Sequence, residues 1–209
     1  MKKLKSTLPN MVIVLVAVAL ITGGLLAYVN NITAGPIKVQ ADKTLSDGIK
    51  AVMGGQEVKV TSNDTVRQAI DGKEAIFVIH KVSNMSGQWL GAAVESTTQG
   101  FGGDLKVLVG FDAKGAISGY TILQHAETPG LGAKANDWFQ KGGKGDIIGK
   151  SPEKDNLTVK KDGGDIDAIT ASTITSRAFL KAITQAYSAY KGQEVDAHSG
   201  ASQQQKKGE

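Results

Sequence analysis

A long apolar stretch near the N-terminus is the strongest pattern in the chain. Residues 11–29 contain no charged side chain, and three lysines lie within the first five residues. A helix of this length, at about 1.5 Å per residue, spans the hydrocarbon core of a bilayer, which is about 30 Å thick. Since the next cation is Lys38, the positive-inside rule places residues 1–10 in the cytoplasm and the body of the chain outside it. A cleaved signal peptide is the alternative, although its apolar core is usually about 7–15 residues long.

The pattern becomes mixed after the apolar stretch. Residues 30–41 are expected to form a tether. Apolar residues then recur at helical spacing from Leu45 to Met53, and Gly54 and Gly55 are expected to end this helix. We therefore assign residues 30–74 to a tether followed by a region of helix and strand.

The middle of the chain has the alternation typical of β-strands. Residues 105–111 place Leu105, Val107, Val109 and Phe111 on one face. A turn at 112–115 joins this segment to the next one, which predicts a hairpin. The predicted strands are residues 75–82, 88–96, 105–111 and 116–125.

The C-terminal third predicts helices. Residues 136–141 are expected to form a short helix. A longer helix precedes Gly192, with one apolar face made by Ala178, Phe179, Ala182, Ile183, Ala186, Tyr187 and Tyr190. Residues 193–209 are polar and are expected to be a disordered tail. The fold class predicted is α+β, with a single N-terminal transmembrane helix followed by one mostly antiparallel-sheet domain, residues 75–192, and its flanking helices.

Composition excludes several kinds of chemistry. The chain has no cysteine and only three histidines, which excludes iron–sulfur clusters, thiolate zinc sites and a cysteine nucleophile. The net charge of +4 comes from the two ends, since five of the 24 basic residues and one of the 20 acidic residues lie there. A body without net charge lacks the basic face that nucleic-acid binding requires. A redox role would therefore need a cofactor held without thiolate or imidazole ligands.

Two segments are candidates for a binding site. The first, residues 127–132, reads ETPGLG and follows a predicted strand. Pro129 restricts the backbone while the glycines allow it to approach a ligand; a plain turn is the alternative. The second, residues 167–177, concentrates hydroxyl groups where the last helix begins, which suits a phosphate. Its alternative is an ordinary helix cap made by Thr175 or Ser176.

These two segments resemble a family of FMN-binding domains whose flavin is joined to a threonine by a phosphoester, and the resemblance covers residues 75–190. Its attachment motif is approximately D-x-x-[ST]-G-A-[ST]-x-T. Asp167, Thr170, Thr173 and Thr175 match this motif, while Ala171 stands for glycine and Ser172 for alanine. The glycine position matters only if the backbone there needs a positive φ. ETPGLG matches the second family signature, and residues 100–103 resemble its glycine-aromatic loop more weakly.

The resemblance implies roles for individual residues. Thr175 would carry covalent FMN, attached by a separate flavin transferase. Glu127 and Thr128 would face the isoalloxazine ring, and Leu131 would pack near it. Gly132, Thr170, Ser172 and Thr173 complete the implied cofactor-binding set; no catalytic residue and no metal ligand is assigned.

The size and the single N-terminal helix favour the G subunit of Rnf-type ion-translocating complexes. That resemblance implies a membrane-anchored electron carrier, a redox subunit and not a complete enzyme, in a complex coupling ferredoxin/NAD electron transfer to ion transport. It also implies an inner-membrane location, with the FMN domain on the extracytoplasmic side and the other complex subunits as partners. Three alternatives stay open: the C subunit of a sodium-pumping NADH:quinone reductase, a non-redox anchored ligand-binding module, and a structural subunit that has lost its flavin.

Overall fold

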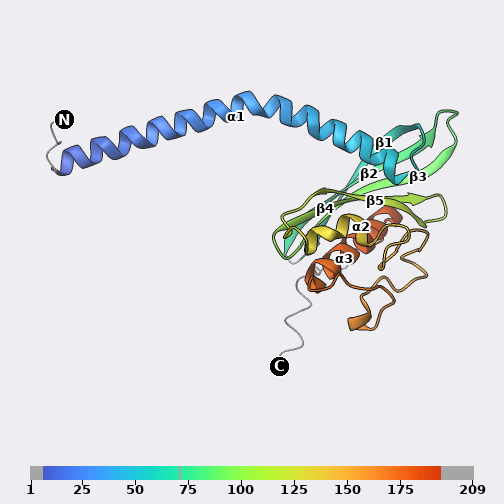
Figure 1. Cartoon of the computed structure of the whole chain (residues 1–209). Helices are drawn as coiled ribbons and strands as arrows, with labels where there is room; N and C mark the ends of the chain where they lie inside the picture. The colour runs from blue at the N-terminus through green and yellow to red at the C-terminus, as the bar shows by residue number, and fades with distance from the viewer. Residues whose placement is uncertain (1–6, 71, 194–209) are drawn as a thin grey trace. The chain divides into compact units, whose positions relative to one another are not determined.

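The computed structural model describes residues 7–70 and 72–193 (Figure 1). The chain divides into two units, one ending at Thr44 and the other beginning at Leu45. The lysines on which the topology prediction rests, and residues 194–209 of the predicted disordered tail, lie outside the described residues.

Helix α1, Leu8–Val52, contains the predicted anchor. In the part of the chain that the structure describes, it is the one helix long and apolar enough to cross a membrane, and no side chain of its apolar stretch is buried. Residues 30–41, expected to be a tether, are helical and include Pro36. The predicted helix end is confirmed, because Gly54 and Gly55 adopt positive φ angles of 88° and 74° and the Gly55 N–H donates to the Lys50 carbonyl at 2.9 Å.

A five-stranded antiparallel sheet forms the centre of the second unit, and its strands lie in chain order because short turns join them. The strands are β1 Val58–Ile70, β2 Lys73–Asn84, β3 Trp89–Gln99, β4 Asp104–Asp112 and β5 Ile117–Gln124. The four predicted strands are confirmed. Strand β1 lies within residues 30–74, where the sequence predicted a region of helix and strand without giving bounds for a strand; this edge strand is exposed along most of its length.

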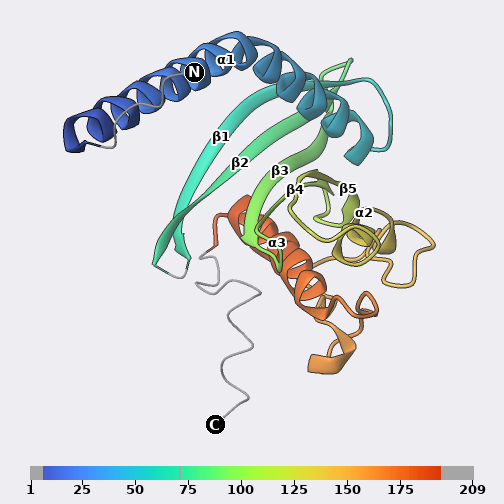
Figure 2. The ribbon, with the colours of Figure 1, turned by 60° about the vertical axis from the view of Figure 1, so that its left-hand side comes forward.

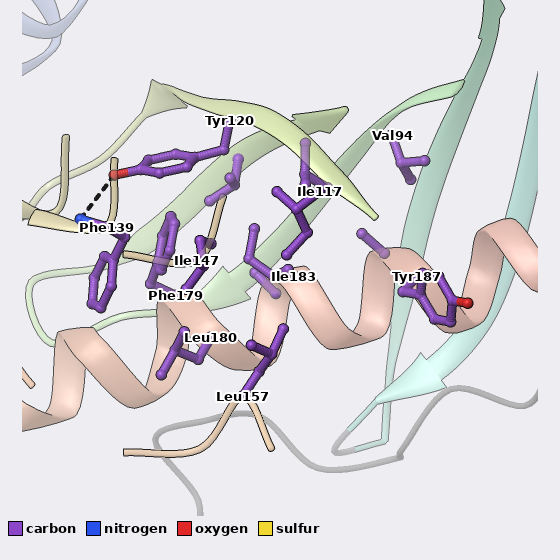
Figure 3. Close-up of a cluster of buried hydrophobic side chains, with 14 of the residues drawn as sticks. Val94, Ile117, Tyr120, Phe139, Ile147, Leu157, Phe179, Leu180, Ile183 and Tyr187 are labelled. Atoms are coloured by element: carbon purple, nitrogen blue, oxygen red, sulfur yellow. Dashed lines mark hydrogen bonds between the residues drawn. The ribbon is translucent and has the colours of Figure 1, made fainter. Parts of the chain in front are cut away.

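Helix α3, Thr173–Lys191, lies across one face of the sheet (Figures 1 and 2). The predicted alternation in β4 is confirmed, because Leu105, Val107, Val109 and Phe111 are all buried in the cluster that α3 completes. Figure 3 shows Phe179 and Ile183 of α3 directed into this cluster. The helix ends at Gly192, which has the predicted left-handed conformation, with a φ of 67°. The short helix expected at 136–141 is α2, Ala135–Trp138.

The last turn of α1 packs on the other face of the sheet. Ile49 and Val52 are buried against side chains of β2, β3 and β4. Gly110 and Gly119 lie opposite each other in β4 and β5, and a Cβ atom on Gly110 would lie 2.5 Å from the Val52 carbonyl oxygen. The Ser118 hydroxyl donates to the same oxygen at 2.6 Å. The two glycines therefore let the end of α1 rest directly on the sheet backbone.

Tyr120 joins the sheet to the segment that follows it. Its hydroxyl donates to the Ala135 carbonyl at 2.7 Å and accepts the Phe139 N–H at 3.2 Å (Figure 3). Burial raises the pKa of Tyr120 far above its ordinary value. The hydroxyl therefore satisfies two backbone groups in the core.

We expect Tyr120→Phe to lower the free energy of unfolding by about 1–3 kcal/mol, because the Phe139 N–H and the Ala135 carbonyl lose a buried partner. Thermal and denaturant unfolding of the full chain in detergent would measure the change. Tyr190→Phe is the matched control, since within the described residues the Tyr190 hydroxyl has no hydrogen-bond partner. Equal effects of the two substitutions would contradict the role given to the Tyr120 hydroxyl.

Candidate functional site

A cavity of about 380 Å³ brings the two candidate segments together. It is lined by Glu127, Thr128, Leu131 and Gly132 from the segment after β5, by residues 171–175 at the start of α3, and by Phe101 from the loop between β3 and β4. The structure thus places seven of the eight predicted site residues around one cavity. Thr170 is the exception, because it is exposed and lies outside the lining.

The hydroxyl of Thr175 is paired with a carboxylate at the inner end of this cavity. Thr175 Oγ1 donates to Glu127 Oε2 at 2.6 Å, the short distance typical of a hydrogen bond between a hydroxyl and an ionised acceptor. Thr175 is 1% exposed and Glu127 is 5% exposed. A buried carboxylate is stable only when donors surround it, so this contact fixes both side chains.

The other carboxylate oxygen of Glu127 is held by the loop between β3 and β4. Glu127 Oε1 accepts the N–H groups of Phe101 at 2.8 Å and Gly102 at 3.2 Å. Both oxygens of Glu127 are therefore occupied by hydrogen bonds within the chain. The structure therefore places this carboxylate against Thr175 and the backbone of this loop, within the lining of the cavity, and the implied contact with a flavin ring stays a prediction.

Two glycines make room for the carboxylate, and a third makes room for the backbone beside it. A Cβ atom on Gly100 would collide with Glu127 Oε1, and one on Gly132 would collide with Glu127 Oε2. A Cβ atom on Gly102 would collide with the Ala126 carbonyl oxygen. Gly100, Gly102 and Gly132 are therefore required by close approach to Glu127 and to the backbone beside it.

The start of α3 presents free backbone donors to the cavity. Ser172 is the N-cap, its side chain makes no capping hydrogen bond, and the first N–H groups of a helix have no partner within the helix. Lys161 Nζ lies 3.5 Å from the Thr173 hydroxyl and adds a cation to this end. The alternative that Thr175 or Ser176 caps the helix is wrong, because both residues lie inside it. The arrangement suits an anion.

Arg177, in the second turn of α3, connects this helix to the 3-10 helix η2, Lys160–Asp162. Its Nε and a terminal nitrogen donate to the two carboxylate oxygens of Asp162 at 2.6 and 2.7 Å. These hydrogen bonds raise the pKa of Arg177. The forked ion pair joins η2, and with it the backbone of Lys161, to α3.

A tight turn with a positive φ leads into the helix. The Ser172 N–H donates to the Ile169 carbonyl at 3.0 Å, which closes a four-residue turn. Ala171, the third residue of the turn, has a φ of 61° and is the only non-glycine residue with positive φ that the structure describes. A type II turn requires a positive φ at this position, which favours glycine. The departure of Ala171 from the family motif therefore falls where glycine is preferred.

Some features of the site had little or no signal in the sequence. The loop at 100–103 was identified by its glycine-aromatic pattern, but its backbone donors to Glu127 were not. Lys161 was not identified as a site residue, because a lysine in a turn is ordinarily solvated. Within the ranges 7–70 and 72–193, no group of three or more histidine, aspartate or glutamate side chains could hold a metal ion.

Known proteins match the segment that forms this cavity. A family model described as FMN-binding domain matches residues 100–188, which include every residue of the lining. A relative from Shewanella oneidensis, named as the G subunit of an ion-translocating oxidoreductase complex, is 34% identical over 182 residues, covering 80% of this chain and 82% of the relative. Proteins of the same name from Vibrio atlanticus and Aliivibrio fischeri are 33% and 36% identical; the first match covers 83% of this chain and 86% of the relative, the second 60% of each.

We expect Ala171→Gly to raise the free energy of unfolding by about 0.5–1 kcal/mol. Glycine removes a left-handed strain of about 1–2 kcal/mol but costs about 0.5–1 kcal/mol in chain entropy. Thermal unfolding of the full chain would measure the change. Ala113→Gly is the matched control, because Ala113 lies in an exposed turn without positive φ. This substitution relieves no strain and should lower the free energy of unfolding. If Ala171→Gly lowered the free energy of unfolding as much as the control does, the backbone strain assigned to Ala171 would be contradicted.

Proposed function

The chain belongs to the family of G subunits of ion-translocating oxidoreductase complexes, and from that premise we propose that it is a membrane-anchored electron carrier with FMN joined to Thr175 by a phosphoester bond. FMN supplies transfer of one or two electrons and needs no cysteine or histidine ligand. This agrees with a chain that has no cysteine. The carrier is one redox component of a larger complex.

The observation that carries the proposal is the placement of the Thr175 hydroxyl. It lies in the cavity lining, 2.6 Å from Glu127, within the first turn of a 19-residue helix. Among the hydroxyl groups of residues 170–176, it is the only one that bonds to a carboxylate in the described part of the chain. Thr170 is exposed outside the lining, which argues against it as the attachment point.

The cavity fits the two chemical parts of FMN. A phosphate on Thr175 Oγ1 would meet the free N–H groups at the start of α3, with Lys161 as a nearby cation. Phe101 and Leu131 are 68% and 41% exposed and offer apolar surface for a flavin ring. A volume of about 380 Å³ lies within the range of about 300–1,000 Å³ common for ligand pockets.

The proposal extends to the membrane and to the partners. We place the anchor at residues 11–29, with the N-terminus in the cytoplasm and the FMN domain, residues 75–192, on the extracytoplasmic side. Strand β1 precedes residue 75 but is the edge strand of the sheet in this domain. Other subunits of the complex would exchange electrons with the flavin, and a separate flavin transferase would form the phosphoester.

Substitution of the hydroxyl residues tests the attachment. We expect Thr175→Ala to abolish in-gel flavin fluorescence after denaturation, because no oxygen remains to form the ester. Thr170→Ala and Thr173→Ala are the matched controls and should retain at least part of the fluorescence. The wild-type chain, produced with the transferase, should gain the mass of one FMN less one water. A peptide map that places this mass on Thr170 or Thr173 would overturn the assignment, and an unmodified wild type would exclude covalent FMN.

A reporter fusion tests the sidedness. A reporter fused after Gly35 should be active only outside the cytoplasm, because the lysines before the apolar stretch retain the N-terminus inside. The mature protein should also retain residues 11–29, as determined by intact mass. A mature N-terminus near Gly35 would instead identify a cleaved signal peptide and end the anchor proposal.

A further inference from the structure

The hydrogen bond between Thr175 and Glu127 fixes the direction of the threonine proton. A hydroxyl has one proton and two lone pairs, and the proton of Thr175 Oγ1 points at Glu127 Oε2, 2.6 Å away. Thr175 also lines the cavity. The oxygen therefore has its proton committed to a carboxylate while its lone pairs remain available for a new bond.

Glu127 is held in the orientation that a proton acceptor needs. The Phe101 and Gly102 N–H groups bind Oε1, so only Oε2 is presented to Thr175. The carboxylate is buried, and it occupies space that a Cβ atom on Gly100 or Gly132 would take. A general base must lie within hydrogen-bond distance of the proton that it removes, and this contact satisfies that requirement before any partner binds.

We propose, resting on the attachment of FMN to Thr175, that Glu127 is the general base for that attachment and selects Thr175 from the neighbouring hydroxyl groups. Thr173 lies beside the cation of Lys161, which does not accept a proton. The Ser176 hydroxyl donates to the Ser172 carbonyl at 3.0 Å and accepts the Ile169 N–H at 2.9 Å. Within the described residues, Thr175 alone combines access to the cavity with a carboxylate partner.

The reaction balances with an anhydride of FMN, such as a flavin dinucleotide, as the donor held by the transferase. Thr175 Oγ1 forms a bond to the phosphorus of the FMN moiety, and its proton moves to Glu127 Oε2. The P–O bond of the anhydride breaks, and the second phosphate leaves with that electron pair. Glu127 then gives the proton to the leaving phosphate or to water and returns to the carboxylate. No oxidant or reductant is consumed.

The surrounding charges favour the approach of the donor. An anionic phosphate would be repelled by Glu127, but the positive end of α3 lines the cavity, and Lys161 lies beside Thr173 of that lining. Donors aimed at the position where charge develops stabilise such a transfer. The base and the anion site are therefore supplied by the acceptor chain itself.

The test measures attachment rates with purified components. The full-length chain, produced without the transferase, is mixed in detergent with purified transferase and flavin adenine dinucleotide, and in-gel fluorescence gives the initial rate between pH 6 and pH 10. We expect Glu127→Gln, which keeps the size of the side chain, to slow attachment by about 10²–10⁴-fold. Its rate should rise about tenfold per pH unit as hydroxide replaces the missing base, whereas the wild-type rate should depend less on pH.

The controls separate a base from a structural role. Glu95→Gln removes a buried carboxylate that bonds to His80 and Lys106 outside the cavity and should leave the rate unchanged. A Glu127→Gln rate within threefold of wild type would overturn the inference. So would a slower rate with the same pH profile as wild type, because loss of shape or recognition is not restored by hydroxide. Failure of the wild type to be modified on Thr175 would instead overturn the proposed attachment.

Discussion

The carboxylate of Glu127 accepts hydrogen bonds from Phe101, Gly102 and Thr175, which lie on two other segments of the chain. It thereby joins the loop between β3 and β4, the segment after β5 and the first turn of α3. An ionised group taken out of water must be surrounded by donors, so the three segments are constrained to meet around it. Glycine is needed wherever their backbones approach the carboxylate most closely. The Glu127 carboxylate therefore joins the three segments that line the cavity.

Local patterns were sufficient to predict most of the fold. The alternation of apolar residues in β4 and the apolar face of α3 predict which side chains are buried, because one side of each element packs in the core. Strand β1 has no such apolar alternation, since it is an edge strand with mostly exposed side chains. The helical path through residues 30–41 was missed for a similar reason. These residues are exposed along most of their length, so their sequence shows no helical repeat of apolar residues. Pro36 also favours an interruption of the helix at this point.

The site was predictable as a set of residues but not as a geometry. ETPGLG and the hydroxyl-rich segment stand out by composition. The relatives from Shewanella and Vibrio confirm the family, and the attachment motif of that family predicts Thr175 among several hydroxyls. The hydrogen bond between Thr175 and Glu127 joins residues 48 positions apart, and a pattern of neighbouring residues in the sequence cannot predict such a contact. The backbone donors of Phe101 and Gly102 have no side-chain signature at all. Hence the sequence indicated a flavin pocket, whereas only the structure shows that Glu127 faces the Thr175 hydroxyl.

The departures from the family motif bear on whether the flavin has been lost. Ser172 keeps a residue type favoured at helix N-caps, although its side chain makes no capping bond. Ala171 keeps the positive φ of a glycine position, because hydrogen bonds on both sides of it hold the turn: the Ser172 N–H bonds to Ile169, and the Ser176 hydroxyl bonds to both Ile169 and Ser172. The backbone therefore follows the path that glycine would allow, at a cost in strain. Since that path brings Thr175 to Glu127, the two departures change residues without displacing the Thr175 hydroxyl, and they give no support to the alternative that this subunit has lost its flavin.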